Sequence, residues 1–234
     1  MMKDIVKPTV ILTAVALACA LLLSHVQRLT GPVIEKRARE RREQALSLAL
    51  PGYTVGPERK VALDGAEFTW WEGEKKVDDK SEKGYAFIVK TPGNDGDIEA
   101  IAGVDGNNRI TGLTIISQAE TPGLGARCVE IPDRETFWDH FREGIPPRDR
   151  SGEARIPWFQ KQFEGLDAGT KIGFLRRGVW DPGMREVLLE KNSISAITGA
   201  TITSTAVIAG IEKGMALLAR ARSMQAPAAE GGAR

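Results

Sequence analysis

Residues that bind metals or form cross-links are scarce in this sequence. Its 234 residues include 2 cysteines and 2 histidines. Cys19 stands inside an apolar run and Cys128 lies far from it, so the two predict no disulfide framework. No Cys-x-x-Cys pair occurs, and neither His25 nor His140 has the spacing of a metal ligand. We therefore expect no metal site, and any redox cofactor would be organic.

An excess of charge of either sign is also missing. The sequence has 32 Lys+Arg and 31 Asp+Glu, a formal net charge of +1, and no long basic run interleaved with aromatic residues. This balance argues against nucleic acid as a partner. No pair of residues suggests a general acid and base, and no activated nucleophile is evident. We accordingly predict no catalytic residue.

A long apolar run lies near the N-terminus. After a short segment, residues 1–7, residues 8–26 read PTVILTAVALACALLLSHV without Asp, Glu, Lys or Arg. A helix rises about 1.5 Å per residue, so this run nearly spans a hydrocarbon core of about 30 Å and predicts a transmembrane anchor. A cleaved signal peptide is the alternative, but the small residues Ala18 and Ala20 fall within the run rather than after it.

The side of the membrane is less directly indicated. Most of the nearby basic residues follow the apolar run, which by count places the C-terminal part in the cytoplasm. These cations are interleaved with Glu35, Glu40 and Glu43, and long domains cross membranes regardless of such a bias. The charge pattern alone leaves both orientations open.

Beyond the anchor, the sequence predicts a connecting helix and one α+β domain. Residues 27–52 read as a charged helix that ends at Pro51 and Gly52. Residues 53–222 form the domain, and residues 223–234, rich in alanine and glycine, form a flexible tail.

Strand-like runs within the domain predict a mainly antiparallel sheet with packed helices. They lie at residues 85–91, 98–104, 109–117, 171–175 and 193–197. The run Asp105-Gly106-Asn107-Asn108 separates two of them and is typical of a hairpin. We expect the polar residues 70–83 to form an exposed loop and residues 135–142 to form a short helix.

A run of hydroxyl residues precedes the last helical segment. It reads Thr198-Gly199-Ala200-Thr201-Ile202-Thr203-Ser204. A helix N-terminus has unpaired N–H groups and a partial positive charge, which favour hydroxyl caps and phosphate groups alike. Thr201 is therefore a candidate for holding a phosphate, and an ordinary capped helix is the alternative.

The helical segment itself, residues 205–222, is predicted to pack on another element. Its apolar residues recur at helical spacing. Ala206, Gly210 and Gly214 stand four apart, which would let another backbone come close.

A glycine-rich run directly follows the predicted strand 109–117. It reads Gln118-Ala119-Glu120-Thr121-Pro122-Gly123-Leu124-Gly125-Ala126. Proline and two glycines predict a tight turn whose exposed backbone N–H groups can reach a planar or phosphorylated ligand. A turn without a ligand is the alternative.

Together, ETPGLG at Glu120–Gly125 and TGAT at Thr198–Thr201, behind a single N-terminal span, resemble the FMN-binding domain family. The arrangement is similar to that of the G subunits of Rnf ion-translocating electron-transport complexes. In that family a flavin transferase joins FMN through a phosphoester to the last threonine of TGAT, which is Thr201 here. The resemblance further implies FMN contacts at Thr198, Gly199, Ala200, Thr203, Glu120, Thr121, Gly123, Leu124 and Gly125.

The chain departs from the family's usual pattern at two positions. An aspartate usually stands three residues before the first Ser or Thr of the motif, where this chain has Ser195. The loop usually opens with histidine, where this chain has Gln118. The hydroxyl acceptor Thr201 is intact, so we still expect the modification.

The resemblance implies a subunit that relays electrons through FMN and is not catalytic alone. Its setting would be a complex that exchanges electrons between ferredoxin and NAD and couples this flow to the movement of Na⁺ or H⁺. Its partners would be the other membrane subunits and, during maturation, the flavin transferase. The protein would cross the inner (cytoplasmic) membrane once, with its soluble domain on the periplasmic or extracytoplasmic side.

Three alternatives remain open from the sequence. The C subunit of a Na⁺-pumping quinone reductase shares the anchor, the domain and the linkage. An FMN-binding sensor or regulatory module would hold the cofactor without pump function. An anchored interaction domain would hold no cofactor and would stay colourless when produced with a flavin transferase.

Overall fold

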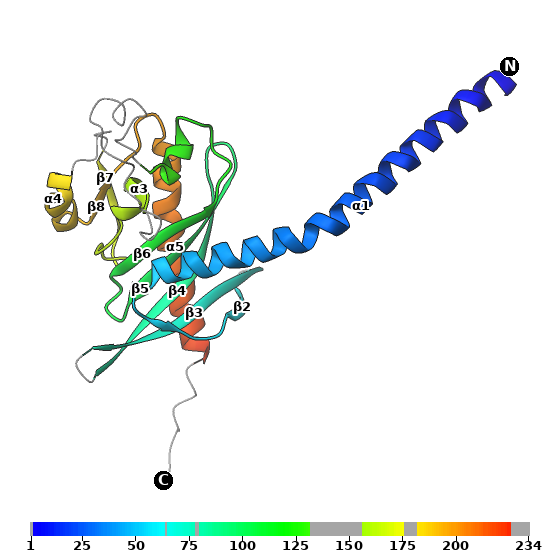
Figure 1. Cartoon of the computed structure of the whole chain (residues 1–234). Helices are drawn as coiled ribbons and strands as arrows, with labels where there is room; N and C mark the ends of the chain where they lie inside the picture. The colour runs from blue at the N-terminus through cyan, green and yellow to red at the C-terminus, as the bar shows by residue number, and fades with distance from the viewer. Residues whose placement is uncertain (1, 64, 78–79, 132–155, 176–181, 226–234) are drawn as a thin grey trace, which may run out of the picture. The chain divides into compact units, whose positions relative to one another are not determined.

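The computed structural model describes residues 2–63, 65–77, 80–131, 156–175 and 182–225 (Figure 1). The chain divides into two compact units, Met1–Gln44 and Ala45–Arg234, and each is described by itself. The predicted helix at residues 135–142 lies outside the described residues, as does most of the predicted tail at residues 223–234.

The first unit consists of most of helix α1, which spans Met2–Ala49. Its large apolar side chains are exposed, with Leu12 at 72% and Leu23 at 71%. The stretch Pro8–Ala49 is long and apolar enough to cross a membrane. The predicted anchor and connecting helix are continuous, because α1 passes through Pro32 without a break.

The second unit contains an antiparallel sheet, and the predicted α+β class is confirmed (Figure 1). The sheet order is β1-β3-β4-β5-β6, and β2 also pairs with β3. Two of the predicted strands lie within β4 and β5, a third matches β6 except at Arg109, and the expected hairpin joins β5 to β6. The strands are β1 (Thr54–Val55), β2 (Arg59–Leu63), β3 (Ala66–Val77), β4 (Lys80–Pro92), β5 (Asp97–Asp105) and β6 (Ile110–Ser117).

Shorter elements and one long helix complete the described part of this unit. Strands β7 and β8 pair in parallel, and they overlap the last two predicted strands. The last helix continues through Gln225, so the first three residues of the predicted tail are helical. These elements are η1 (Gly125–Val129), α3 (Trp158–Lys161), β7 (Gly173–Leu175), η2 (Pro182–Met184), α4 (Arg185–Glu190), β8 (Ser193–Ser195) and α5 (Thr201–Gln225).

Apolar side chains cover both faces of the central sheet. Because successive side chains of a strand point to opposite faces, Trp70 and Trp71 belong to different clusters. Trp70 joins the larger core beneath α5, whereas Trp71 packs with Ala45 and Leu50 at the end of α1. The hydroxyl of Thr111 on β6 donates to the Ala49 carbonyl at 2.5 Å. The last turn of α1 is thereby part of the second unit.

Helix α5 lies along the sheet and packs on β4 (Figure 1). A Cβ on Gly210 would lie 2.4 Å from Cγ1 of Val89, and one on Gly214 would lie 2.3 Å from Cε2 of Phe87. The nearest atoms are side-chain atoms of β4 rather than the backbone that we expected to approach, so these glycines make room for Val89 and Phe87. The helix is apolar enough to cross a membrane by composition, but its burial against the sheet explains that composition.

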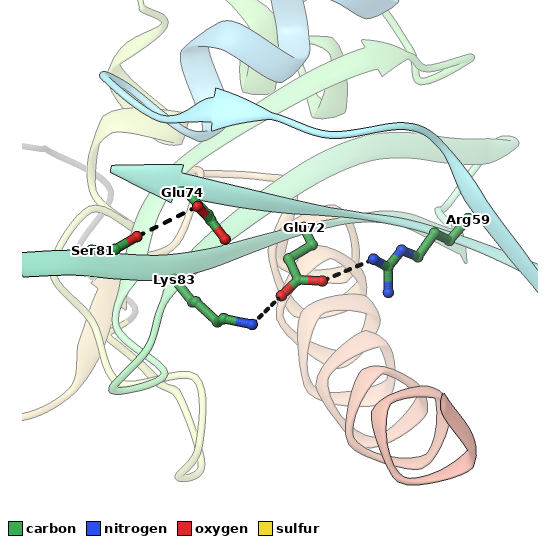
Figure 2. Close-up of polar contacts among 5 residues, drawn as sticks. All are labelled: Arg59, Glu72, Glu74, Ser81 and Lys83. Atoms are coloured by element: carbon green, nitrogen blue, oxygen red, sulfur yellow. Dashed lines mark hydrogen bonds and ion pairs between the residues drawn. The ribbon is translucent and has the colours of Figure 1, made fainter. Parts of the chain in front are cut away.

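The prediction that residues 70–83 form an exposed loop is wrong. Most of this segment belongs to β3 and β4, which pair from Trp70 opposite Phe87 to Val77 opposite Lys80. The segment can be polar and still form strands, because its charged side chains pair with those of neighbouring strands. Figure 2 shows the Glu72 carboxylate between Lys83 and Arg59, and the Ser81 hydroxyl directed at Glu74. The distances from Glu72 are 2.7 Å to Lys83 Nζ and 3.0 Å to an Arg59 terminal nitrogen.

Replacing Glu72 with glutamine is expected to lower the stability at neutral pH by roughly 1 kcal/mol, because two ion pairs are lost. Lys83, by its hydrogen bond, holds the pKa of Glu72 below the ordinary 4.5, against the opposing effect of burial. The contribution of the ionised Glu72 to the free energy of unfolding is therefore present above pH 4.5 and is lost as the pH falls through the lowered pKa. Urea unfolding at pH 7 and pH 3 tests this prediction.

The matched control for Glu72→Gln is Glu67→Gln. The Glu67 side chain is 61% exposed and pairs with Lys60, so its loss should cost only a few tenths of a kcal/mol. An equal loss for both variants at pH 7, or a difference between wild type and Glu72→Gln that does not shrink as the pH is lowered from 7 to 3, would contradict the prediction.

Candidate functional site

The start of α5 places Thr201 at a helix N-terminus. Strand β8 ends at Ser195, and the chain then turns through Gly199, whose φ of 77° is in the region that favours glycine. The Ala200 N–H donates to the Ile197 carbonyl at 3.0 Å, which closes the turn. Helix α5 begins at the next residue, and Thr201 is half-buried there. Thr201 therefore belongs to the first helical turn, whose N–H groups have no partner within the helix.

Ser204 holds this turn in place from inside the fold. Its hydroxyl accepts the Ile197 N–H at 3.0 Å and donates to the Ala200 carbonyl at 3.0 Å. Ser204 has no exposed surface. One buried hydroxyl thus links the chain before the turn to the first residues of α5.

Replacing Ser204 with alanine is expected to destabilise the protein by about 1–3 kcal/mol, because the Ile197 N–H would be left buried without its partner. Urea unfolding measures the loss. The exposed Ser223, which also donates to a helical carbonyl, provides the control, and Ser223→Ala should change stability by less than about 0.5 kcal/mol. Equal effects of the two substitutions would argue against the role of Ser204.

Glu120 links the glycine-rich run to the start of α5. Its side chain is 6% exposed, and its Oε2 accepts the Thr203 hydroxyl at 2.7 Å. Its Oε1 accepts the Asn94 N–H at 2.6 Å, from the turn between β4 and β5. A Cβ on Gly125 would lie 2.2 Å from Glu120 Oε2, so only glycine fits beside this carboxylate. Three segments far apart in the sequence therefore meet at Glu120.

A second carboxylate, that of Asp95, holds the residue after Glu120. Asp95 Oδ2 accepts the Thr121 N–H at 3.0 Å and also the Thr121 hydroxyl. The hydroxyl of Thr121, by its hydrogen bond, lowers the pKa of Asp95 below its usual value. Asp95 is therefore charged at neutral pH.

A pocket of about 280 Å³ lies where these segments meet. Its described lining contains two carboxylates, those of Asp95 and Glu120, and no lysine, arginine or histidine. Two apolar side chains at the pocket are largely exposed, Leu124 at 46% and Ile202 at 57%. The lining residues are Asn94, Asp95, Glu120, Thr121, Leu124, Gly125, Gly199, Ala200, Thr201, Ile202 and Thr203.

The structure brings most of the predicted site residues together. All of them line this pocket except Thr198 and Gly123. The Thr203 hydroxyl donates a hydrogen bond to Glu120. Thr203 therefore joins the two motifs, and its hydroxyl hydrogen is not directed at a phosphate. Sequence reasoning missed Ile202, which lies inside the predicted run, and also Asn94 and Asp95. Asn94 and Asp95 belong to the turn between β4 and β5. Their Gly/Asn/Asp-rich run signals a turn, but nothing in it indicates which loop lies opposite.

The two positions that depart from the family pattern have local partners. The Ser195 N–H donates to Gln162 Oε1 at 2.7 Å, and Ser195 is 1% exposed and does not line the pocket. The Gln118 side chain accepts the Glu120 N–H at 2.6 Å and so shapes the start of the loop.

Cys128 lies in η1, just after the glycine-rich run, and is buried. Burial, and to a lesser degree the charge of Glu120, raises the pKa of its thiol to about 12. The thiolate is the reactive form, so this cysteine stays protonated and inert near neutral pH.

The fold and the pocket define a class: an α+β domain with a long N-terminal helix and a ligand pocket at the start of its last helix. The chain belongs to the FMN-binding domain family, whose model matches residues 93–216. A model of the RnfG N-terminal region matches residues 1–48. The apolar N-terminal helix and the match to the RnfG N-terminal region both indicate a membrane-anchored protein.

An individual relative supports this assignment. The G subunit of the Na(+)-translocating ferredoxin:NAD(+) oxidoreductase complex of Acetobacterium woodii is 27% identical over 211 residues, which cover 86% of this chain and 84% of that protein. The predicted resemblance to Rnf G subunits is thereby confirmed. A crystal structure of the C subunit of the Na(+)-translocating NADH-quinone reductase from Parabacteroides distasonis aligns with a TM-score of 0.45 and 16% identity. That alignment covers 77% of this chain and 91% of that one.

Proposed function

We propose that the protein is a membrane-anchored electron-transfer subunit of an Rnf-type ferredoxin:NAD oxidoreductase complex, and that FMN is attached to Thr201 through a phosphoester. The family assignment and the similarity to the G subunit of the Acetobacterium complex support this role. The observation that carries the proposal is the position of Thr201, which opens α5 at a pocket formed by both sequence motifs.

The start of α5 suits a phosphodiester. The flavin transferase would take FMN from FAD. The Thr201 oxygen would form a bond to the phosphorus of the FMN half, the bond from that phosphorus to AMP would break, AMP would leave and the hydroxyl proton would be lost. The remaining single negative charge would be stabilised by the N–H groups and the partial positive charge of the helix N-terminus. Gly199 and Ala200 leave room for the phosphate because neither has a long side chain.

The rest of the pocket suits part of a flavin ring. A volume of about 280 Å³ is at the small end of the range for ligand pockets, so the remainder of the ring would extend toward solvent or a partner. Leu124 and Ile202 would contact the ring and exclude water from it. FMN would supply the electron-transfer chemistry, and the protein would bind and orient it.

The absence of basic side chains among the described lining residues favours a covalent bond over simple binding. Free FMN carries a phosphate with up to two negative charges, and the two carboxylates at this pocket would repel it. An ester bond removes one charge and retains the cofactor without a cation. Thr198 and Gly123 would contribute by shaping the two loops rather than by contact with the ring.

The similarity to an Rnf complex subunit supports the setting that we propose. The other membrane subunits of the complex would be its partners, and a separate flavin transferase would attach the cofactor. We place the protein in the cytoplasmic membrane with a single span and the domain on the extracytoplasmic side. A single span provides no ion path by itself, so ion movement would belong to the other subunits.

Co-expression with a flavin transferase tests the proposal. We expect a mass increase of one FMN less one water, and flavin fluorescence that persists after denaturing electrophoresis. Protein that is fully folded yet colourless and unmodified, under conditions that modify a related protein of the family, would contradict the proposal.

A further inference from the structure

We propose that Asp95 is a positioning residue for the flavin site, which it serves by holding residues Glu120–Leu124 against the start of α5. This inference rests on the proposed function. Asp95 belongs to neither sequence motif, and it lies in the turn between β4 and β5. Its carboxylate reaches the loop through Thr121.

The two segments hold each other by reciprocal hydrogen bonds. Asp95 accepts both the N–H and the hydroxyl of Thr121, while Glu120 accepts the Asn94 N–H at 2.6 Å and the Asp95 N–H at 3.5 Å. Glu120 is in turn bonded to Thr203 on α5. A continuous chain of hydrogen bonds therefore joins the β4–β5 turn to the helix that carries Thr201.

The two halves of this arrangement differ in burial. Glu120 is buried, so its loss would disturb the core, whereas Asp95 and Thr121 are both exposed. Exposed hydrogen bonds contribute little to global stability. The loop after Thr121 contains two glycines, and the Asp95 bonds link its first residue to the β4–β5 turn. We therefore expect these bonds to determine the position of the pocket wall more than the stability of the fold.

Loss of this bond would therefore free one wall of the pocket. Leu124 would no longer be held beside Gly199, and the attached flavin would become more mobile and more accessible to solvent. Two substitutions of Asp95 should differ in their effect on the loop. Asp95→Ala removes both hydrogen bonds to Thr121, whereas Asp95→Asn keeps one side-chain carbonyl oxygen that can accept them.

The test uses flavin-loaded protein and compares Asp95→Ala, Asp95→Asn and the control Asp97→Ala. Asp97 is also exposed and acidic, at the start of β5, but does not line the pocket. For Asp95→Ala we expect iodide to quench the flavin about twofold more efficiently and the fluorescence anisotropy to fall, with the urea midpoint close to that of wild type. Asp95→Asn should restore most of the anisotropy. Equal quenching in Asp95→Ala and Asp97→Ala would overturn the proposal.

A second measurement separates this proposal from the proposed function. Amide hydrogen exchange of residues 120–125 in unmodified protein should be faster in Asp95→Ala, and faster in Thr121→Val than in Thr121→Ser, which keeps the hydroxyl. If wild type never acquires covalent flavin, the proposed function fails and the exchange result still decides whether Asp95 holds the loop. If wild type is modified but exchange is unchanged, the Asp95 proposal alone is wrong.

Discussion

Replacing Thr201 with alanine is expected to abolish covalent FMN completely. The substitution removes the oxygen that forms the ester, and no neighbouring hydroxyl occupies the same position at the first residue of α5. The Thr203 hydroxyl is buried and bonded to Glu120, and that of Thr205 is bonded to the carbonyls of Thr201 and Ile202. Flavin fluorescence after denaturing electrophoresis and intact mass measure the result.

Two variants control for Thr201→Ala. Thr201→Ser keeps a hydroxyl at the same position and should retain the modification. Thr205→Ala removes a hydroxyl one turn further along the helix and should leave it unchanged. Because Thr201 is only half-buried, its alanine variant should also keep the fold, which the urea midpoint checks. Persistent covalent flavin in Thr201→Ala would show that another residue is the acceptor.

Gly214→Val is expected to lower the stability by roughly 1–3 kcal/mol. The new Cβ would lie 2.3 Å from Cε2 and 2.6 Å from Cδ2 of Phe87. Phe87 has no exposed surface and cannot move aside without disturbing the core. Helix α5 or the sheet would have to shift, and urea unfolding measures the cost.

The control for Gly214→Val is Ala216→Val, which places the same side chain at an exposed position of the same helix. Only the small helix penalty of a β-branched residue, a few tenths of a kcal/mol, is expected there. Stability of Gly214→Val equal to that of Ala216→Val would contradict the packing of α5 on β4.

The sequence predicted those features that depend on local patterns. Helix α5 follows from the spacing of its apolar residues, and the β5–β6 hairpin follows from the turn residues at positions 105–108. The juxtaposition of the two motifs was predicted from family resemblance rather than from spacing, since Glu120 and Thr203 are 83 positions apart.

Features that depend on long-range pairing were not predicted. The paired ends of β3 and β4 have the polar composition of a loop, because Glu72, Lys83 and Arg59 neutralise one another only when the strands are aligned. Asp95 has no signature of its own, since its role arises from a loop 26 positions away. In both cases the physical cause is a side-chain partner that the sequence does not identify.

The central claim is tested most directly by locating the flavin on the chain by mass spectrometry. Trypsin cleaves after Lys191 and Lys213, so residues 192–213 form one peptide that contains Thr201 and the neighbouring hydroxyls of Thr198, Thr203, Ser204 and Thr205. Fragmentation of this peptide from protein made with a flavin transferase should place one FMN phosphoester on Thr201. An unmodified peptide, or FMN on another residue, would contradict the account.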